Sequence, residues 1–255
     1  MATNAARRTR SIAFYAVAGI ATLLTGLLTV GAVAAVLGGG LSDDGMVAAV
    51  AHVPWLALCY CAAFASMLFH PARRPAAFQQ ALATAASMYV GGAITSVDDP
   101  VFFIGFAVVL LTLGLTHPAR SALLRPGAAG ISPVLVTLAL VMAAPLALYS
   151  VRVGQIPNTD GPDGVFYTAI AATALTVPCV ALVAGLRAAG WRLPLWVTGA
   201  TLVVLCGASL AAPDAISAMP VWGAVVGVVG GALFVLAGEW ESRRVAATDR
   251  TPVPV

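Results

Sequence analysis

The sequence predicts an all-α, polytopic integral membrane protein: a helical bundle with eight transmembrane helices in a single domain. Apolar residues make up 60% of the 255 residues and charged residues only 9%, whereas about a quarter of a soluble domain is charged. The apolar residues are gathered in runs close to the ~20 residues that cross a bilayer. In addition, arginines and acidic residues separate into alternating loops, as expected when successive loops lie on opposite sides of a membrane.

Charges, prolines and glycine clusters divide the chain into eight apolar runs. A basic segment, residues 1–11, precedes the transmembrane domain, which covers residues 12–244. The third and fourth runs are the shortest, and a tight turn at Asp98 and Asp99 joins them. The expected spans are residues 12–37, 46–69, 78–95, 100–116, 133–150, 165–186, 194–212 and 216–237.

The two ends of the chain need separate interpretations. Three arginines precede the first run, as they do in a signal peptide, but the run from Ile12 to Leu37 exceeds the ~7–15 apolar residues of a signal peptide. We therefore interpret it as a retained first span, with cleavage near residues 38–40 as the alternative. At the other end, residues 245–255 are polar and contain prolines, so we expect a disordered cytoplasmic tail.

The distribution of charge predicts the orientation. If the N-terminus is inside, twelve of the 13 cationic residues, all of them arginine, lie on the cytoplasmic side, and Arg152 is the exception. The positive-inside rule then places both termini in the cytoplasm. The arginine-only composition, rich in alanine and valine, favours a bacterial plasma membrane. The absence of lysine excludes Schiff-base chemistry.

Polar side chains inside a span are the default candidates for function in a membrane protein. His52 is the ionisable residue well inside a span, where it could contact a ligand or bond to a neighbouring helix. Tyr89 lies at a comparable depth on the third span. Pro54, Pro145 and Pro178 are expected to interrupt their helices, and the resulting kinks could open an outward-facing cavity.

The outer loops offer one further polar constellation, formed by Arg152 with Asp160 or Asp163. It could attract a ligand, or the acidic loops could only solvate the surface. His70 and His117 each precede a proline at the inner surface and cannot share an ion with His52. We therefore expect no catalytic residue, no metal site and no cofactor.

The last span contains glycines at four-residue spacing, Gly223, Gly227 and Gly231. Such spacing leaves a flat strip on one side of a helix, where a neighbouring backbone can approach closely. The neighbour could be another helix of this chain or a helix of a second protein.

The sequence does not determine the biochemical role. The leading hypothesis is a non-enzymatic bundle that binds or transports a small, neutral or apolar solute through an outward-facing cavity near His52 and Tyr89. One alternative is a structural or accessory membrane subunit, a homo-oligomer or the partner of another membrane protein, that pairs through the glycine strip. Another is an intramembrane metal-dependent hydrolase. The lipid bilayer is an expected partner, and nucleic acid is not.

Overall fold

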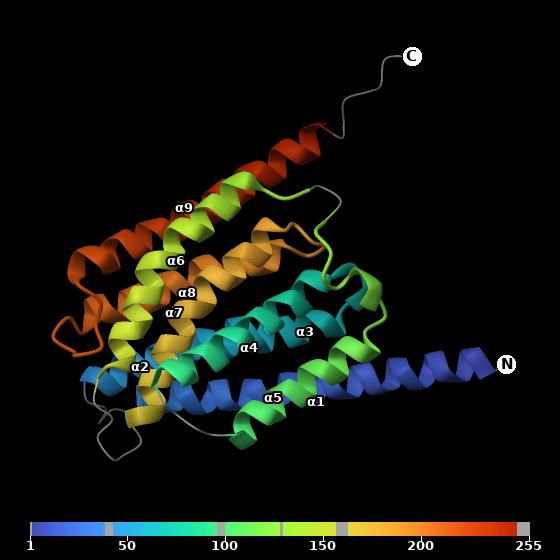
Figure 1. Ribbon diagram of the computed structural model, residues 1–255, viewed down its shortest axis with the longest axis horizontal. Helices are drawn as coiled ribbons and strands as arrows, with labels where there is room; N and C mark the ends of the chain where they lie inside the picture. Colours follow the sequence, from blue (N-terminus) through green and yellow to red (C-terminus); the bar gives the residue numbers. More distant parts are fainter. Residues whose placement is uncertain (1, 39–42, 96–99, 128–129, 157–162, 249–255) are drawn as a thin grey trace.

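The computed structural model describes the whole chain except residues 1, 39–42, 96–99, 128–129, 157–162 and 249–255 (Figure 1). All regular secondary structure in this described part is helical. The α-helices are α1 (Ala2–Leu37), α2 (Asp43–Pro54), α3 (Ala62–Leu68), α4 (Pro75–Thr95), α5 (Pro100–Thr116), α6 (Pro133–Gly154), α7 (Asp163–Gly185), α8 (Arg192–Ala211) and α9 (Val221–Thr248). A π-helix, η1 (Trp55–Cys61), joins α2 to α3, and η2 (Pro71–Arg73) and η3 (Arg120–Ala122) are short 3₁₀ helices.

Six helical segments are long and apolar enough to cross a membrane, which indicates a multi-pass membrane protein. They are Arg8–Leu37, Gly45–Leu68, Pro133–Gly154, Tyr167–Gly185, Arg192–Ala211 and Val221–Arg244. The expected third and fourth spans are also helical, as α4 and α5, but α4 is less apolar and α5 is shorter than these six segments. Gln79 and Gln80 lower the hydropathy of α4, and α5 has only 17 residues.

Several helix boundaries differ from those expected. The first helix already begins at Ala2, and α9 continues to Thr248, so it includes residues 245–248 of the expected tail. Of the three prolines expected to interrupt their helices, Pro54 ends α2, whereas α6 and α7 continue across Pro145 and Pro178. A proline removes one backbone hydrogen bond, and packing against neighbouring helices can hold the remaining turns in place.

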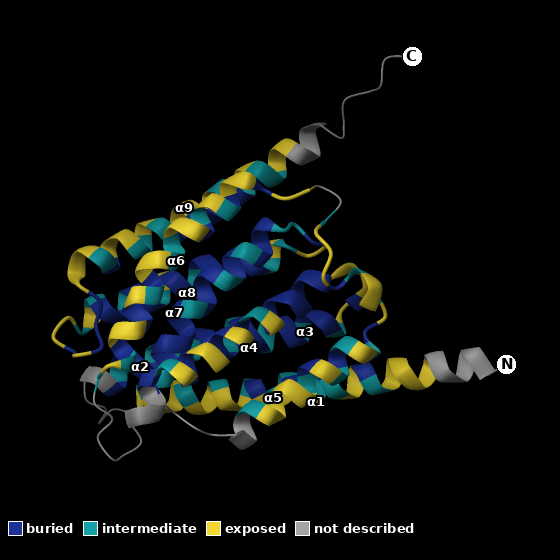
Figure 2. Ribbon diagram, viewed as in Figure 1, coloured by how far each residue is buried: buried dark blue, intermediate teal, exposed yellow. Residues whose placement is uncertain are grey.

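Helix α7 lies at the centre of the bundle and α1 at its edge (Figure 2). In the most apolar window of α7, 78% of the residues are buried, compared with 11% in that of α1. Helix α7 packs most extensively against α4 and α6 and also contacts α8 and α2. A Cβ atom at Gly91 of α4 would lie 2.9 Å from the backbone of Ala172 in α7. This contact helps to explain why α4 is well buried although it contains Gln79 and Gln80.

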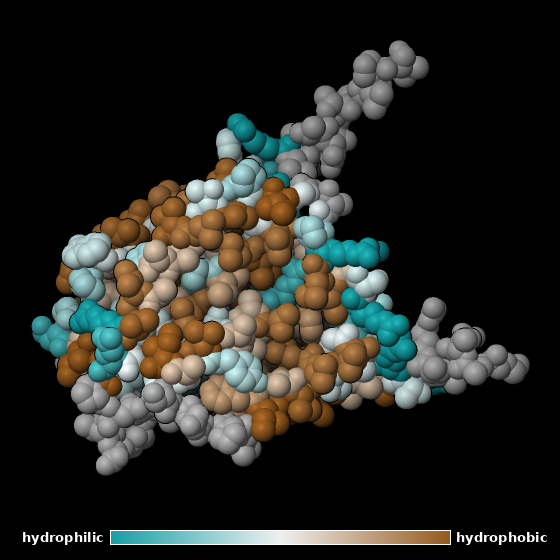
Figure 3. All heavy atoms as spheres, viewed as in Figure 1, coloured by the Kyte–Doolittle hydropathy of each residue, from teal (hydrophilic) through white to brown (hydrophobic). Residues whose placement is uncertain are grey.

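The molecular surface divides into an apolar middle and two hydrophilic ends (Figure 3). We call one of them the basic end; it carries η2, η3, the turn between α7 and α8, and the last turns of α9. The start of α1 lies on the same side (Figure 1). The exposed arginines of the loops and of α8 and α9 at the basic end are Arg73, Arg74, Arg120, Arg125, Arg192, Arg243 and Arg244. Arg152 and Asp214 are exposed at the other end.

A buried polar network fixes three helices together at the basic end. Arg187 and Glu241 form an ion pair that is largely buried. The hydroxyl of Ser132, the N-cap of α6, donates to Oε2 of Glu241 at 2.6 Å and accepts from the amide of Leu135 at 3.1 Å. Because removing one partner would leave a buried charge unpaired, this network is costly to break.

Candidate functional site

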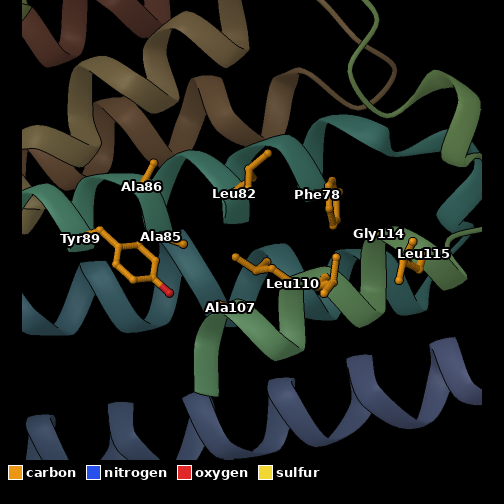
Figure 4. Close-up of a pocket in the computed structure, with 10 residues that line it drawn as sticks. Phe78, Leu82, Ala85, Ala86, Tyr89, Ala107, Leu110, Gly114 and Leu115 are labelled. Atoms are coloured by element: carbon orange, nitrogen blue, oxygen red, sulfur yellow. The ribbon is translucent and has the colours of Figure 1, made fainter. Parts of the chain in front are cut away.

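An apolar groove separates the middle turns of α4 and α5 (Figure 4). Its volume is about 460 Å³, within the ~300–1,000 Å³ typical of small-molecule sites. The groove opens at the side of the bundle, where Leu82, Leu111 and Leu115 are 40%, 63% and 61% exposed. The lining residues are Phe78, Leu82, Ala85, Ala86, Tyr89, Ala107, Leu110, Leu111, Gly114 and Leu115.

Aromatic rings set on glycines close the two ends of the groove. At the basic end, the ring of Phe78 lies on Gly114, where a Cβ atom would come within 3.1 Å of it. At the other end, a Cβ atom at Gly92 would lie 2.5 Å from the ring of Phe103. Tyr89 stacks on that same ring with centroids 5.0 Å apart, and its hydroxyl donates to the carbonyl of Phe103. The rings therefore act as spacers between the two helix backbones.

Three alanines and three leucines, Leu82, Leu110 and Leu111, line the middle of the groove. The alanines are Ala85 and Ala86 of α4 and Ala107 of α5, and Figure 4 shows the short side chain of Ala85 on the side of α4 that faces α5. An alanine cannot span the separation that the rings at both ends impose. The resulting space is elongated along the helices and is bordered by hydrocarbon and aromatic groups.

Tyr60 of the π-helix η1 packs behind α5 and is fully buried. Its ring lies 4.7 Å from that of Phe106 and 5.2 Å from that of Trp55, and its hydroxyl donates to the sulfur of Met88 at 3.9 Å. Trp55 in turn contacts the ring of His52 at 5.4 Å. A continuous series of rings therefore connects α2 with α5.

Gln80 of α4 stabilises the irregular backbone of the second span. Its amide donates to the carbonyls of Leu58 and Cys59 in η1, at 2.9 Å and 3.1 Å. Where a π-helix returns to α-helical spacing, as it does after the amide of Ala62 bonds to Ala57, one carbonyl is left without a donor from its own helix. In a bilayer such a carbonyl needs an internal partner, and Gln80 provides it.

The predicted ligand-binding residues lie in different places. Tyr89 lines the groove, while His52 lies on α2 against Trp55. Arg152 points its guanidinium at the carbonyls of Ile216 and Ala218, each at 3.5 Å, in the connection between α8 and α9. It therefore helps to hold this connection against the end of α6.

The two predicted acidic partners of Arg152 are Asp160 and Asp163. Asp160 lies outside the described residues. Asp163 is the first residue of α7, and its side chain also lies outside the described part.

The glycine strip of α9 has two environments. A Cβ atom at Gly227 would lie 2.2 Å from the sulfur of Cys206, and one at Gly231 would lie 3.0 Å from the carbonyl oxygen of Gly199. Both of these glycines therefore face α8. Gly223 has no neighbour within 4 Å of such an atom.

Sequence reasoning missed Gln79 and Gln80. Both side chains are almost fully buried, and their amides support neighbouring backbone. The signal was visible, because two adjacent glutamines inside an apolar run are costly in hydrocarbon unless they are hydrogen-bonded. The alanines of the groove gave no such signal, since an alanine is equally common in a packed core.

Comparisons with protein-family models, with curated proteins and with solved structures gave no match for this chain. The described part of the chain is that of an all-helical, multi-pass membrane protein with an apolar groove at the side of its bundle.

Proposed function

We propose that this chain is a non-enzymatic membrane protein that binds an uncharged hydrocarbon group in the groove between α4 and α5. The observation that carries this proposal is the volume of about 460 Å³ bordered by apolar side chains. Such a lining desolvates an apolar ligand and offers no charge to a polar one. Because the groove opens at the apolar side of the bundle, its ligand would enter from the bilayer.

The proposed topology has eight spans, with both termini in the cytoplasm of a bacterial cell. Burial of Gln79 and Gln80 supports the inclusion of α4, because their amides bond to backbone carbonyls and do not face lipid. The 17 residues of α5 extend about 25 Å, a mismatch that local thinning of the bilayer accommodates. The concentration of arginines at the basic end supports a cytoplasmic position for that end.

The accessory-subunit candidate has less support. Gly227 and Gly231 already accommodate α8 of the same chain. Gly223, with open space around it, is the part of the predicted strip that a second protein could reach.

A photoactivatable, uncharged aliphatic alcohol tests the proposed function directly. With the chain in phosphatidylcholine vesicles, we expect cross-links on Leu82, Ala86 and Leu111 to be several-fold more abundant than on the exposed Leu140 and Leu148 of α6. Excess unlabelled alcohol should remove the difference. Equal labelling of α4, α5 and α6 would show that the groove is an ordinary lipid-facing surface and would overturn the proposal.

A pair of matched variants controls for changes in the bilayer contact. Ala86→Leu places a larger side chain in the groove, so we expect it to abolish most of the preferential labelling. Ala144→Leu makes the same change on the exposed face of α6 and should leave the labelling pattern unchanged. Equal labelling of the two variants would contradict binding in the groove.

A further inference from the structure

We propose that the ligand of the groove is an anionic phospholipid, with one acyl chain between α4 and α5 and its headgroup on the arginines of the basic end. This inference rests on the proposed function and adds the chemical class of the ligand. A phosphate group suits guanidinium donors, and an acyl chain suits the elongated apolar space.

The groove ends about one helical turn from the arginines of the basic end, where Phe78 closes it between the two helices and the exposed Leu115 leaves its side open. Phe78, which closes it there, is one helical turn after Arg74, and Leu115 on α5 is five residues before Arg120. Arg73 and Arg120 are both exposed. A molecule whose chain lies in the groove would therefore have its polar group among these arginines.

Buried contacts hold the arginine-bearing segments next to the groove. The amide of Gln79, in the first turns of α4, donates to the carbonyl of Leu123 at 2.6 Å and to that of Arg125 at 3.3 Å. The segment after α5 is thereby fixed against the start of α4. The headgroup site is accordingly part of the folded structure and not a loose loop.

Helix α1 packs against the same region through Phe14, which contacts His117 after the end of α5. The His117 ring packs at 5.1 Å from that of Phe14 in α1 and at 6.2 Å from that of Phe78. Arg10 is exposed one turn before Phe14. Exposed arginines from three segments therefore lie within five residues of side chains that pack at this end of the groove.

These arginines are not neutralised by acidic side chains of the described part. The ion pairs found there, Arg187 with Glu241 and Arg192 with Glu239, both belong to the α7–α9 side of the bundle. Arg10, Arg73, Arg120 and Arg125 have no ion pair with a described carboxylate. The positive charge beside the groove is thus available to a lipid, and one arginine near a membrane surface contributes about fivefold to anionic lipid binding.

Two phospholipid probes with the same photoactivatable acyl chain test the inference. One carries a phosphatidylglycerol headgroup and the other a phosphatidylcholine headgroup, each at the same low fraction in phosphatidylcholine vesicles. We expect the anionic probe to label α4 and α5 at least fivefold more than the zwitterionic probe. Arg73→Gln with Arg120→Gln should bring the ratio close to one, whereas Arg243→Gln, at the same end but on α9, should leave it unchanged. Digestion with chymotrypsin keeps peptides comparable when arginines are replaced.

The outcomes separate this inference from the proposed function. A ratio near one in the unmodified chain, with the uncharged alcohol still labelling the groove, would overturn the anionic ligand and leave the groove function intact. If the alcohol also fails to label the groove, both proposals fall. The arginine variants must retain labelling by the alcohol, which shows that their groove is folded. If Arg243→Gln lowers the labelling ratio as much as the double variant does, the preference reflects the overall positive charge of the basic end. That outcome would overturn the proposed headgroup site.

Discussion

Two faces of α4 use small residues to opposite effect. Against α7, Gly91 allows backbone contact with Ala172, and the hydroxyls of Thr95 and Thr168 meet at 2.7 Å. Against α5, the alanines lie beside an empty groove, because aromatic rings at both ends keep the helices apart. A small residue therefore produces close packing only where nothing larger sets the distance between two backbones.

The largest effect is expected from breaking the tight face. Gly91→Leu would drive a side chain into the backbone of Ala172, so we expect a loss of about 3 kcal/mol in the free energy of unfolding, at the upper end for overpacking. Ala86→Leu places a larger side chain on the groove face and should change the free energy of unfolding by less than about 0.5 kcal/mol. Reversible unfolding in mixed detergent micelles measures both. Equal losses would show that the groove face is packed as tightly as the α7 face.

A smaller loss is expected where α4 supports the π-helix. Gln80→Leu leaves the carbonyls of Leu58 and Cys59 without their side-chain donor, at a cost of about 1–3 kcal/mol. The same unfolding measurement applies. Ser87→Ala serves as the control, because that hydroxyl bonds to the carbonyl of Ala83 in its own helix. A Gln80 variant as stable as the control would mean that the π-helix does not depend on α4.

The smallest effect concerns the basic end of the groove and depends on pH. Burial lowers the pKa of His117 to about 4, and its Nδ1 accepts from the amide of Ala119 at 3.1 Å. The folded chain therefore favours the neutral ring, so stability is full above pH 6.5 and declines as the pH falls toward 4. Between pH 7.5 and 6 the decline should stay below about 1 kcal/mol.

Thermal unfolding of the unmodified chain and of His117→Asn across this pH range checks the prediction. Asparagine can accept the same hydrogen bond but does not titrate, so the variant should show a flatter dependence. Identical pH profiles would assign the decline to other groups. They would also show that protonation of His117 does not weaken the contact between α1, α4 and α5.

The candidate site shows where sequence reasoning reaches its limit. Tyr89, a predicted ligand-binding residue, lines the groove, and a partly polar ring in an apolar run is visible in the sequence. His52 lies elsewhere, on α2. The alanines that create the groove could not be identified, since their role depends on Phe78 and Phe103 of facing helices and not on their own chemistry.

The sequence by itself determined the helical segments, the apolar middle of the molecule and the gathering of arginines at one end. These properties follow from hydropathy and charge, which each residue carries wherever it lies. Only the tertiary structure decided which helix meets which, and hence that α4 contacts α7 closely and α5 across a groove. The reason is that the distance between two helices is set by the largest side chains of both, a property of the pair that neither segment contains alone.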